Sequence, residues 1–348
     1  MKLTEERFRA EQRPGNMPPP VEGVSLTGQV AMITGANTGI GYETAKHFAT
    51  RGPAKLIMIC RSEERGQSAL ARLTSETGFV NVELWIMDLK SLNSIKATKE
   101  KVDKLDRLDI LVENASVGRY VYEMTPDGWE STLQVNVVGA ALHIILNLPK
   151  MLETAERYPK LTPRIVLVTS GAHYTVDLPA ESIHAQNMLE YLNSEEYSRQ
   201  AIETGQGSRY AESKLLEVMF IRALQSHLPT FSPTVTCCSV SPGFCNTELT
   251  REATGEEAET IRKMKEAMAL SSEEGSRQVL YAAVGDRVQE EAFRGAYVAF
   301  TSVQECSDFI LSDEGQRAER KLWNELVDVV SKADGRAKAV IREYLSLA

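Results

Sequence analysis

The sequence is poor in the residues that build disulfide frameworks and metal centres. It contains five cysteines and five histidines in 348 residues, and it has neither a C-x-x-C nor an H-E-x-x-H motif. Cys237 and Cys238 are adjacent, and the histidines are scattered along the chain. This usage is typical of buried, reduced thiols in the cytosol. We therefore expect no disulfides and no metal site.

Two further absences concern membranes and nucleic acids. The longest apolar run, Val137–Pro149, is interrupted by His143 and Asn147 and is too short to span a bilayer. Residues 1–20 are charged and proline-rich, without the apolar core of a secretory signal. The formal net charge of −9 gives an acidic surface that repels a phosphate backbone. We expect a cytoplasmic protein without a membrane span and without a nucleic-acid partner.

What the chain does contain is a regular alternation of short apolar segments and helical patterns. Segments rich in β-branched residues are nearly continuous in apolar character, as expected of strands buried on both faces of a parallel sheet. They are Val30–Thr34, Lys55–Cys60, Val82–Met87, Asp109–Val112, Arg164–Thr169, Thr234–Val240 and Ala296–Phe300. The helical patterns between them are Ile40–Arg51, Glu63–Thr77, Leu92–Leu105, Pro126–Tyr158, Ser208–Leu228 and Glu273–Ala283. This alternation predicts an α/β fold with a doubly wound parallel sheet, the Rossmann fold, in a single domain.

The remaining segments flank or interrupt this pattern. Residues 1–26 are expected to form an N-terminal extension to the domain, which spans 27–348. Residues 311–348 have the pattern of a charged, amphipathic helical tail. Such a tail packs either against the domain or against a partner subunit, which leaves a homo-oligomer open.

A glycine-rich turn follows the first predicted strand directly. Its sequence, Thr34-Gly35-Ala36-Asn37-Thr38-Gly39-Ile40-Gly41, has the spacing G-x-x-x-G-x-G. Glycines allow a tight turn and let backbone N–H groups approach a pyrophosphate at the N-terminus of the next helix. A glycine-rich turn alone is weak evidence, but its place in the first βαβ unit favours a dinucleotide site.

A tyrosine and a lysine lie four residues apart on a predicted helix. In Tyr210-Ala211-Glu212-Ser213-Lys214 the two side chains share one face, with the ammonium one turn beyond the phenol. A free phenol has a pKa of about 10, and a nearby cation lowers it by favouring the phenolate. Such pairs are common on helix surfaces, so the spacing by itself does not indicate catalysis.

Two more polar residues stand in positions that suggest chemistry. Ser170 ends a buried strand, at the carboxyl edge of the sheet where ligands bind. Asn136 lies inside an otherwise apolar helical segment, where a buried amide needs a hydrogen-bond partner. The strand around Ser170 is not a G-x-S-x-G elbow and has no evident acid partner, which argues against a hydrolase. We interpret His173, close to Ser170, as a structural residue behind or beside the pocket.

Found together and in this order, these residues form a pattern that is specific to one family. The chain resembles the short-chain dehydrogenase/reductases from about Thr27 to Phe300. It is similar in particular to retinol-dehydrogenase-type enzymes and to fungal natural-product tailoring reductases. The matching residues are the Thr34–Gly41 loop, Asp88-Leu89, Asn114-Ala115, Asn136, Ser170, Tyr210 with Lys214, and Pro242-Gly243.

The resemblance implies a role for each catalytic position. Tyr210 would be the general acid/base, and Ser170 would hydrogen-bond the substrate oxygen. Lys214 would hold the nicotinamide ribose and lower the pKa of the tyrosine, while Asn136 would anchor a proton-relay water. These roles imply hydride transfer between the cofactor and a carbonyl carbon, with the phenol serving the oxygen.

The resemblance also implies a cofactor-binding set. Asp88 would contact the adenine and Asn114 the ribose side, while Pro242, Gly243 and Thr247 would contact the nicotinamide carboxamide. The full expected set comprises Gly35, Asn37, Thr38, Gly39, Ile40, Gly41, Arg61, Asp88, Leu89, Asn114, Ala115, Tyr210, Lys214, Pro242, Gly243 and Thr247.

The end of the second predicted strand indicates which dinucleotide binds. An acidic residue there bonds the ribose 2′-hydroxyl, whereas a basic residue accepts a 2′-phosphate. The strand ends at Cys60-Arg61, without a carboxylate, and Arg61 can pair with a phosphate in bidentate fashion. Asn37 and Thr38 add neutral donors. The sequence therefore predicts NADP(H), unless Arg61 merely begins a solvated helix.

Two departures from the family pattern bear on function. Glu113-Asn114-Ala115-Ser116 stands where the family has Asn-Asn-Ala-Gly, and Ser116 places a side chain where the cofactor approaches. An insert, residues 173–207, separates Ser170 from Tyr210. We expect this insert either to form a wall or lid over the substrate or to be a peripheral surface excursion.

Three classes of function remain open. The favoured one is an NADP(H)-dependent oxidoreductase that interconverts a ketone or aldehyde and an alcohol on a small hydrophobic substrate, in secondary metabolism by resemblance. The alternative is a non-redox enzyme, a cyclase or isomerase, that uses bound NADP as a template. A catalytically silent binding protein is disfavoured because the four catalytic positions are filled. Oxidation of the cofactor during turnover separates the first class from the second, and any turnover separates both from the third.

Overall fold

The computed structural model describes residues 10, 12, 13, 15, 17–204, 209–230, 233–285 and 287–345. Three parts of the expected organisation lie outside these residues. They are part of the N-terminal extension (1–9, 11, 14 and 16), the last residues of the insert (205–207) and the end of the tail (346–348).

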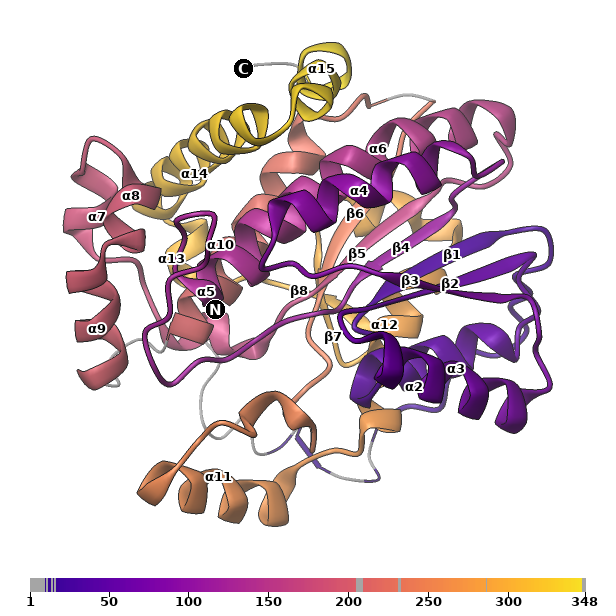
Figure 1. Ribbon diagram of the computed structural model, residues 1–348, viewed down its shortest axis with the longest axis horizontal. Helices are drawn as coiled ribbons and strands as arrows, with labels where there is room; N and C mark the ends of the chain where they lie inside the picture. Colours follow the sequence, from indigo (N-terminus) through magenta and orange to yellow (C-terminus); the bar gives the residue numbers. More distant parts are fainter. Residues whose placement is uncertain are drawn as a thin grey trace.

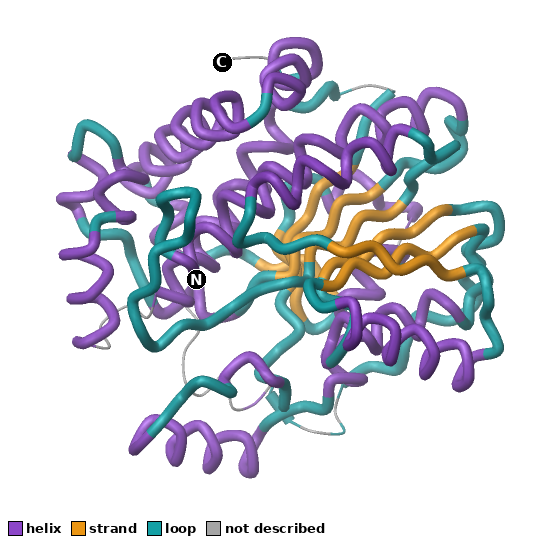
Figure 2. Tube along the Cα trace, viewed as in Figure 1, coloured by secondary structure: helices purple, strands orange, loops and turns teal. Residues whose placement is uncertain are grey.

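One eight-stranded sheet runs through the molecule, in the order β3-β2-β1-β4-β5-β6-β7-β8 (Figures 1 and 2). The strands are β1 (Val30–Thr34), β2 (Lys55–Cys60), β3 (Val82–Ile86), β4 (Ile110–Glu113), β5 (Arg164–Val168), β6 (Thr236–Val240), β7 (Tyr297–Ala299) and β8 (Ser302–Gln304). All neighbours pair in parallel except β8, which is antiparallel to β7. The strand order reverses between β1 and β4, the place where such sheets bind ligands. The predicted doubly wound α/β fold is confirmed.

Helices cover both faces of this sheet (Figure 1). On one face lie α2 (Gly39–Ala49), α3 (Glu63–Thr77) and α12 (Ser272–Val284), and on the other α4 (Leu92–Asp103), α6 (Ala140–Arg157) and α10 (Arg209–His227). Successive side chains of a strand point to opposite faces. In β1, Ala31 and Ile33 therefore join the apolar cluster on one face, whereas Met32 joins the cluster on the other. This double burial explains why the strands read as continuous apolar runs.

The helical pattern expected from Pro126 begins later than predicted. Residues 124–130 form a turn closed by a bridge between Met124 and Glu130. The Glu130 carboxylate then accepts hydrogen bonds from Thr132 N and Leu133 N, which caps the start of α5 (Ser131–Leu133). The stretch Ser131–Arg157 is apolar and long enough to cross a bilayer, but 89% of its most apolar window is buried inside the protein. Its composition is that of a core helix.

The C-terminal tail packs on the body of the same chain. It forms α13 (Asp308–Leu311), α14 (Asp313–Ala333) and α15 (Gly335–Tyr344), beside α10 and α6 (Figure 1). Trp323 of α14 is buried and stacks on His227 of α10, with 4.3 Å between ring centroids. Of the two expected packing partners, the domain itself is the one observed.

The insert contains a 3₁₀ turn, η2 (Gly171–Thr175), followed by α7 (Ala180–His184), α8 (Met188–Asn193) and α9 (Glu195–Thr204). The Glu325 carboxylate of α14 accepts hydrogen bonds from Met188 N and Leu189 N at the start of α8. Helices α7 and α8 of the insert are therefore held against the C-terminal tail.

The elements that were not expected from the sequence include a helix, a 3₁₀ turn and a strand. A helix, α11 (Gly255–Met268), stands off from the sheet (Figure 1), and a 3₁₀ turn, η3 (Glu248–Thr250), precedes it. Strand β8 was missed because its turn carries no glycine or asparagine. Phe300 and Thr301 form that two-residue turn with φ of 52° and 53°, angles usually reserved for those residue types.

Candidate active site

Two cavities meet at the carboxyl edge of the sheet. A cleft of about 270 Å³ follows the glycine loop past the ends of β1, β2 and β4. A larger cavity of about 700 Å³ lies beyond it, lined by the start of the insert, the residues after β6, and η3 and α11. Tyr210 lines both cavities. The phenol therefore stands where a molecule in the cleft and a molecule in the cavity would touch.

The glycine loop has a shape that only glycine allows. Gly35 has a φ of 67°, and a Cβ there would lie 3.0 Å from Ala115 Cα. A Cβ on Gly41 would lie 2.4 Å from both Asn114 Nδ2 and the Gly35 carbonyl oxygen. The loop therefore closes tightly on the residues that follow β4 and leaves the N-terminus of α2 open toward the cleft.

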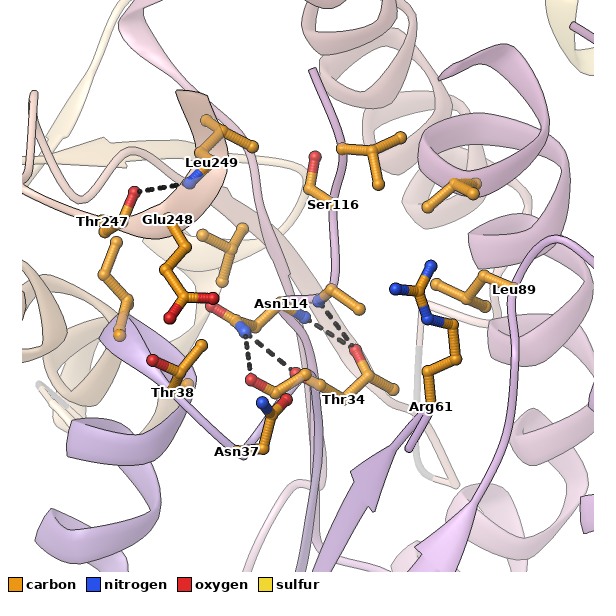
Figure 3. A pocket seen from close by; sticks show the side chains of 18 of the residues that line it. Thr34, Asn37, Thr38, Arg61, Leu89, Asn114, Ser116, Thr247, Glu248 and Leu249 are labelled. Carbon is orange, nitrogen blue, oxygen red and sulfur yellow. Dashed lines mark hydrogen bonds between the residues drawn. The ribbon is translucent and has the colours of Figure 1, made fainter. Parts of the chain in front are cut away.

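Asn114 closes the glycine loop through hydrogen bonds (Figure 3). Its Nδ2 donates to the Thr34 carbonyl at 2.9 Å and to the Gly35 carbonyl at 3.3 Å. Thr34 Oγ1 in turn accepts from Asn114 N and Ala115 N, at 2.9 and 3.0 Å. The side chain expected on the ribose side thus also binds the two segments that form the cleft to each other.

Glu113, a departure from the family pattern, orients the Thr34 hydroxyl that binds the backbone of Asn114 and Ala115. Its Oε2 accepts from Thr34 Oγ1 at 3.0 Å, and its Oε1 is hydrogen-bonded to His143 Nδ1 of α6. Both Glu113 and His143 are almost fully buried. Because the threonine hydroxyl donates to a carboxylate, its oxygen is left to accept both backbone N–H groups.

Ser116 offers an unused polar atom to the cleft. Its Oγ is buried and has no hydrogen-bond partner among the described residues, although the residue lines the cleft. Figure 3 shows the hydroxyl on the far side of the cleft from the glycine loop. A buried hydroxyl without a partner is costly unless a ligand supplies one. Together with the glycine cradle, it fits a dinucleotide in this cleft.

Arg61 extends into the open end of the cleft, near Leu89 (Figure 3). Its side chain is exposed and makes no ion pair with any described residue. Its neighbour Arg65 also lines the cleft, but Arg65 Nη2 is paired with Glu248 Oε2 at 2.7 Å. Of the two guanidinium groups, that of Arg61 is the one left to bind an anion.

Tyr210 and Ser170 are brought together as expected. The two side chains are hydrogen-bonded, and Ser170 Oγ also accepts from Ala172 N at 3.1 Å. A Cβ added to Gly118 would lie 3.6 Å from Tyr210 Cδ2, so the ring lies close to this glycine, and part of the side chain is open to the cavities. Burial of the phenol raises its pKa above the usual value, repulsion by Glu217 raises it further, and the Ser170 hydrogen bond opposes both.

The ammonium of Lys214 is engaged by protein groups, and its expected lowering of the Tyr210 pKa stays a prediction. Lys214 Nζ lies 5.4 Å from the centre of the tyrosine ring, but it is paired with Glu217 at 2.8 and 2.9 Å. Its remaining donor goes to the Val168 carbonyl at 3.1 Å. Burial raises the pKa of Glu217 to about 7, against the attraction of Lys214. The Glu217 carboxylate raises the pKa of Tyr210, which is opposite to the effect expected of the ammonium.

Asn136 lines neither cavity. Its side chain instead hydrogen-bonds the backbone of Val117 and the hydroxyl of Ser213. It sits in a π-helical turn, η1 (Gln134–Gly139), a widening often found at functional sites. Its Oδ1 accepts from Val117 N, and its Nδ2 donates to the Val117 carbonyl and to Ser213 Oγ. Ser213 Oγ donates in turn to the Tyr210 carbonyl at 2.7 Å. Asn136 thus ties the loop after β4 to the helix that carries Tyr210, and its relay-water role stays a prediction.

A buried ion-pair cluster fixes the start of α10. Arg209, next to Tyr210, donates from Nη1 to Glu212 at 2.8 Å and from Nη2 to Glu130 at 3.1 Å. All three side chains are almost fully buried. Because Glu130 also caps α5, the cluster locks the tyrosine-bearing turn to the helix that leads into Asn136.

His173 lies behind the site, as expected of a structural residue. Its Nδ1 is hydrogen-bonded to the Ser170 carbonyl at 2.8 Å, and its ring packs between Tyr174 and Tyr297. Burial lowers its pKa to about 4. The ring is therefore neutral near pH 7 and orients the backbone of Ser170.

The structure groups most of the predicted residues as proposed. Every predicted cofactor-binding residue lines the cleft except Gly243, which lines the larger cavity. The cleft also contains residues that the predicted cofactor-binding set did not include: Thr34, Ile59, Ser62, Arg65, Met87, Lys90, Ser116, Val117, Val135, Val168, Thr169, Glu248, Leu249 and Arg251. Within the insert, Ala201 and Ile202 of α9 line the larger cavity, whereas α7 and α8 pack on α14.

Comparison with known proteins identifies the family. A sequence profile of the short chain dehydrogenases matches residues 29–178. The chain is 31% identical over 323 residues to the short-chain dehydrogenase anuD of Penicillium roqueforti, covering 90% of this chain and 80% of the relative. The chain belongs to the short-chain dehydrogenase/reductase family. A second relative, the short chain dehydrogenase atnD of Emericella nidulans, is 33% identical over 77% of this chain and 83% of its own length.

Solved structures share the fold of this family member. A short-chain dehydrogenase from Sphingobium yanoikuyae in complex with NADPH superposes with a TM-score of 0.51 at 22% identity, over 72% of this chain and 82% of that one. Salutaridine reductase from Papaver somniferum gives a TM-score of 0.57 at 20% identity, over 77% and 99%. At this identity the likeness concerns the fold.

The glycine cradle generates a first prediction. We expect Gly41→Ala to lower both the affinity for a nicotinamide dinucleotide and the thermal stability, because its methyl group would overlap Asn114 Nδ2 and the Gly35 carbonyl. Overpacking of this kind costs about 1–3 kcal/mol. Calorimetric titration and thermal unfolding measure the two effects. The control is Gly335→Ala, where nothing lies within 4 Å of the added methyl; equal behaviour of the two variants would contradict the cradle.

Proposed function

We propose that this protein is an NADPH-dependent reductase of a bulky, hydrophobic and uncharged ketone. The observation that carries the proposal is the position of Tyr210 at the junction of the dinucleotide-shaped cleft and the large cavity. A cofactor and a substrate placed in the two cavities would meet at the one side chain that can move a proton. The resemblance to fungal natural-product tailoring reductases supports a role in secondary metabolism.

The residues of the junction divide the chemistry among them. The bound dinucleotide would supply the hydride for the carbonyl carbon. Ser170 Oγ would hydrogen-bond the carbonyl oxygen. Tyr210 Oη would donate its proton to that oxygen, after which Tyr210 remains in place as the phenolate. Since burial and Glu217 raise the pKa of Tyr210, the phenol is protonated at neutral pH. A protonated phenol is the form that reduction requires, which supports the reductive direction.

The charges around the cavity support an uncharged substrate. Arg119 is paired with Glu123 and Glu252, and Arg209 with Glu130 and Glu212. Lys265 Nζ donates to the Thr247 carbonyl at 2.8 Å. Each cation on the lining thus already has a protein partner. The rest of the lining includes the apolar side chains Ile40, Ala172, Ala201, Ile202, Phe244, Leu249, Ile261, Met264 and Phe300.

A panel of ketones and secondary alcohols, followed by NADPH absorbance, tests the function as a whole. We expect oxidation of NADPH with ring-containing ketones. Conversion of a substrate without any change in the cofactor would favour the non-redox alternative, in which the dinucleotide is a template. That alternative draws its support from the insert and from Ser116 alone.

Arg61 supports the preference for NADPH. We expect the protein to bind NADPH more tightly than NADH, and Arg61→Ala to remove most of the difference. The loss of one charge-assisted contact costs about 1.5–3 kcal/mol, roughly ten- to a hundredfold in affinity. The control is Arg72→Ala on α3, the helix that follows Arg61; the Arg72 guanidinium stacks on Tyr42 outside the cleft. Equal affinities of the unmutated protein for NADH and NADPH would show that Arg61 has no such role.

The general-acid role of Tyr210 has its own test. We expect Tyr210→Phe to lower kcat roughly 10²- to 10⁴-fold, the usual contribution of acid/base catalysis, with little change in NADPH affinity. Tyr191→Phe, in the insert and outside both cavities, should keep full activity. A Tyr210→Phe enzyme that retained more than a few per cent of the rate would contradict the assignment.

Glu217 predicts a pH effect of defined sign. Its carboxylate raises the pKa of Tyr210, so Glu217→Gln should lower that pKa. Alcohol oxidation needs the phenolate, and we expect its acidic limb to move to lower pH in the variant. The pH profile of kcat/KM for oxidation measures the shift. The control is Glu319→Gln on α14, which makes the same change in the ion pair between Glu319 and Arg222 of α10. This variant should leave the pH profile unchanged. An unmoved profile in Glu217→Gln would rule out the electrostatic coupling.

A further inference from the structure

The N-terminal segment, which the sequence presents only as an extension, reaches the wall of the substrate cavity. Gln12 is 1% exposed and lines that cavity. Its Nε2 donates to the Phe244 carbonyl at 2.6 Å and to the Met268 carbonyl at 3.0 Å, while its Oε1 accepts from Phe244 N at 2.9 Å. The Gln12 amide thus pairs with both the N–H and the carbonyl of Phe244, as a neighbouring strand would. It also donates to the carbonyl of a second residue, Met268.

Phe244 and Met268 are the two ends of the segment that carries α11. Their neighbours are already joined, because Leu270 N donates to the Phe244 carbonyl and Asn246 N to the Leu270 carbonyl, each at 2.9 Å. The hydrogen bonds of Gln12 to Phe244 and Met268 form a second connection between the two ends, which we call the clasp. Between the ends, α11 stands away from the sheet (Figure 1). Its pose therefore depends on how firmly its two ends are held.

The sequence makes room for this clasp. Gly243 has a φ of 84°, and a Cβ there would lie 2.9 Å from Gln12 Oε1 and 2.8 Å from Leu270 Cδ1. Met17, further along the segment, is buried against Cys245 and Leu270. A side chain at Gly243 would therefore push Gln12 off the backbone that it binds.

The segment around Gln12 is anchored independently on α12. Gly15 N donates to Glu274 Oε1 at 2.6 Å. Arg277 Nη1 donates to the carbonyls of Met17 and Pro18, at 3.3 and 3.4 Å. Since α12 packs on the sheet beside α2, the clasp connects α11 to the rigid body of the protein.

We propose that Gln12 is a positioning residue that sets the pose of α11 and thereby decides how large a ketone the enzyme accepts. The proposal rests on the reductase function above. Residues from 249 to 265 form one wall of the cavity, among them Leu249, Ile261 and Met264. A small ketone held by Ser170 and Tyr210 need not touch this wall. A large one must, so it loses binding when the wall is loose.

Hydrogen exchange measured by mass spectrometry tests the clasp without any need for activity. We expect Gln12→Ala to speed amide exchange in α11 at least tenfold while α2 and α6 stay protected. Gln12→Glu keeps the shape and the acceptor but removes both donors, and should loosen α11 likewise. The exposed neighbour Arg13→Ala is the control. Unchanged exchange of α11 in both Gln12 variants, with melting temperatures like the wild type, would overturn the clasp.

Steady-state kinetics test the consequence for specificity, with cyclohexanone as the small ketone and 9-fluorenone as the large one. In Gln12→Ala we expect KM for 9-fluorenone to rise about tenfold, with kcat and both constants for cyclohexanone nearly unchanged. An equal fall of kcat for both ketones would overturn the specificity role in favour of general destabilisation. If the unmutated protein reduces neither ketone with NADPH, the proposed function and the specificity role fail, while the exchange data still decide the clasp.

Discussion

The candidate site depends on a buried ion pair that lies close to Tyr210. Lys214 and Glu217 are among the most deeply buried charged side chains of the described chain, 1% and 2% exposed, and lie one helical turn apart on α10. Burying two charges is expensive, and the pair is tolerated because the ammonium uses its three donors on the carboxylate and the Val168 carbonyl. As a result, the Tyr210 phenol lies near an ion pair with almost no net charge instead of near a lone cation. A dinucleotide ribose that engages Lys214 has to compete for donors that are already in use.

The other half of the site is held by a second buried carboxylate. Glu113 receives the Thr34 hydroxyl and His143, and the threonine oxygen then orders the backbone of Asn114 and Ala115. Asn114 closes the glycine loop from the same place. Both halves therefore use a glutamate inside the core to orient a polar group at the cavity surface. Asn136 connects them, through Val117 on one side and Ser213 on the other.

Much of the fold could be predicted because the sheet is buried on both faces, which leaves continuous apolar runs between helical patterns. Strand boundaries agree with the structure to within two residues. The glycine loop and the residues around Tyr210 were found because their spacing is itself the signal. Glu217 was missed because a lysine and a glutamate three apart resemble an ordinary surface pair. The signal available was its place in the apolar stretch Leu215–Met219.

Other features had no local signal. Gln12 lies in a charged, proline-rich segment, and its partners are more than 230 positions away in the chain. Helix α11 is polar on most of its surface, so its sequence shows little of the periodicity that marks a packed helix. The direction of the Tyr210 pKa shift could not be predicted from the lysine spacing, since it depends on burial and on Glu217.

Burial and Glu217 hold the phenol of Tyr210 in its protonated form, and its ionisation can be observed directly. Protein labelled with ¹³C at the tyrosine Cζ would be titrated by NMR in the absence of cofactor, with Tyr210→Phe used to assign the signal. We expect the Tyr210 signal to keep the chemical shift of a neutral phenol beyond the pKa of free tyrosine, about 10. A Tyr210 signal that moves to the phenolate position between about pH 6 and 8, well below the free value, would contradict this expectation.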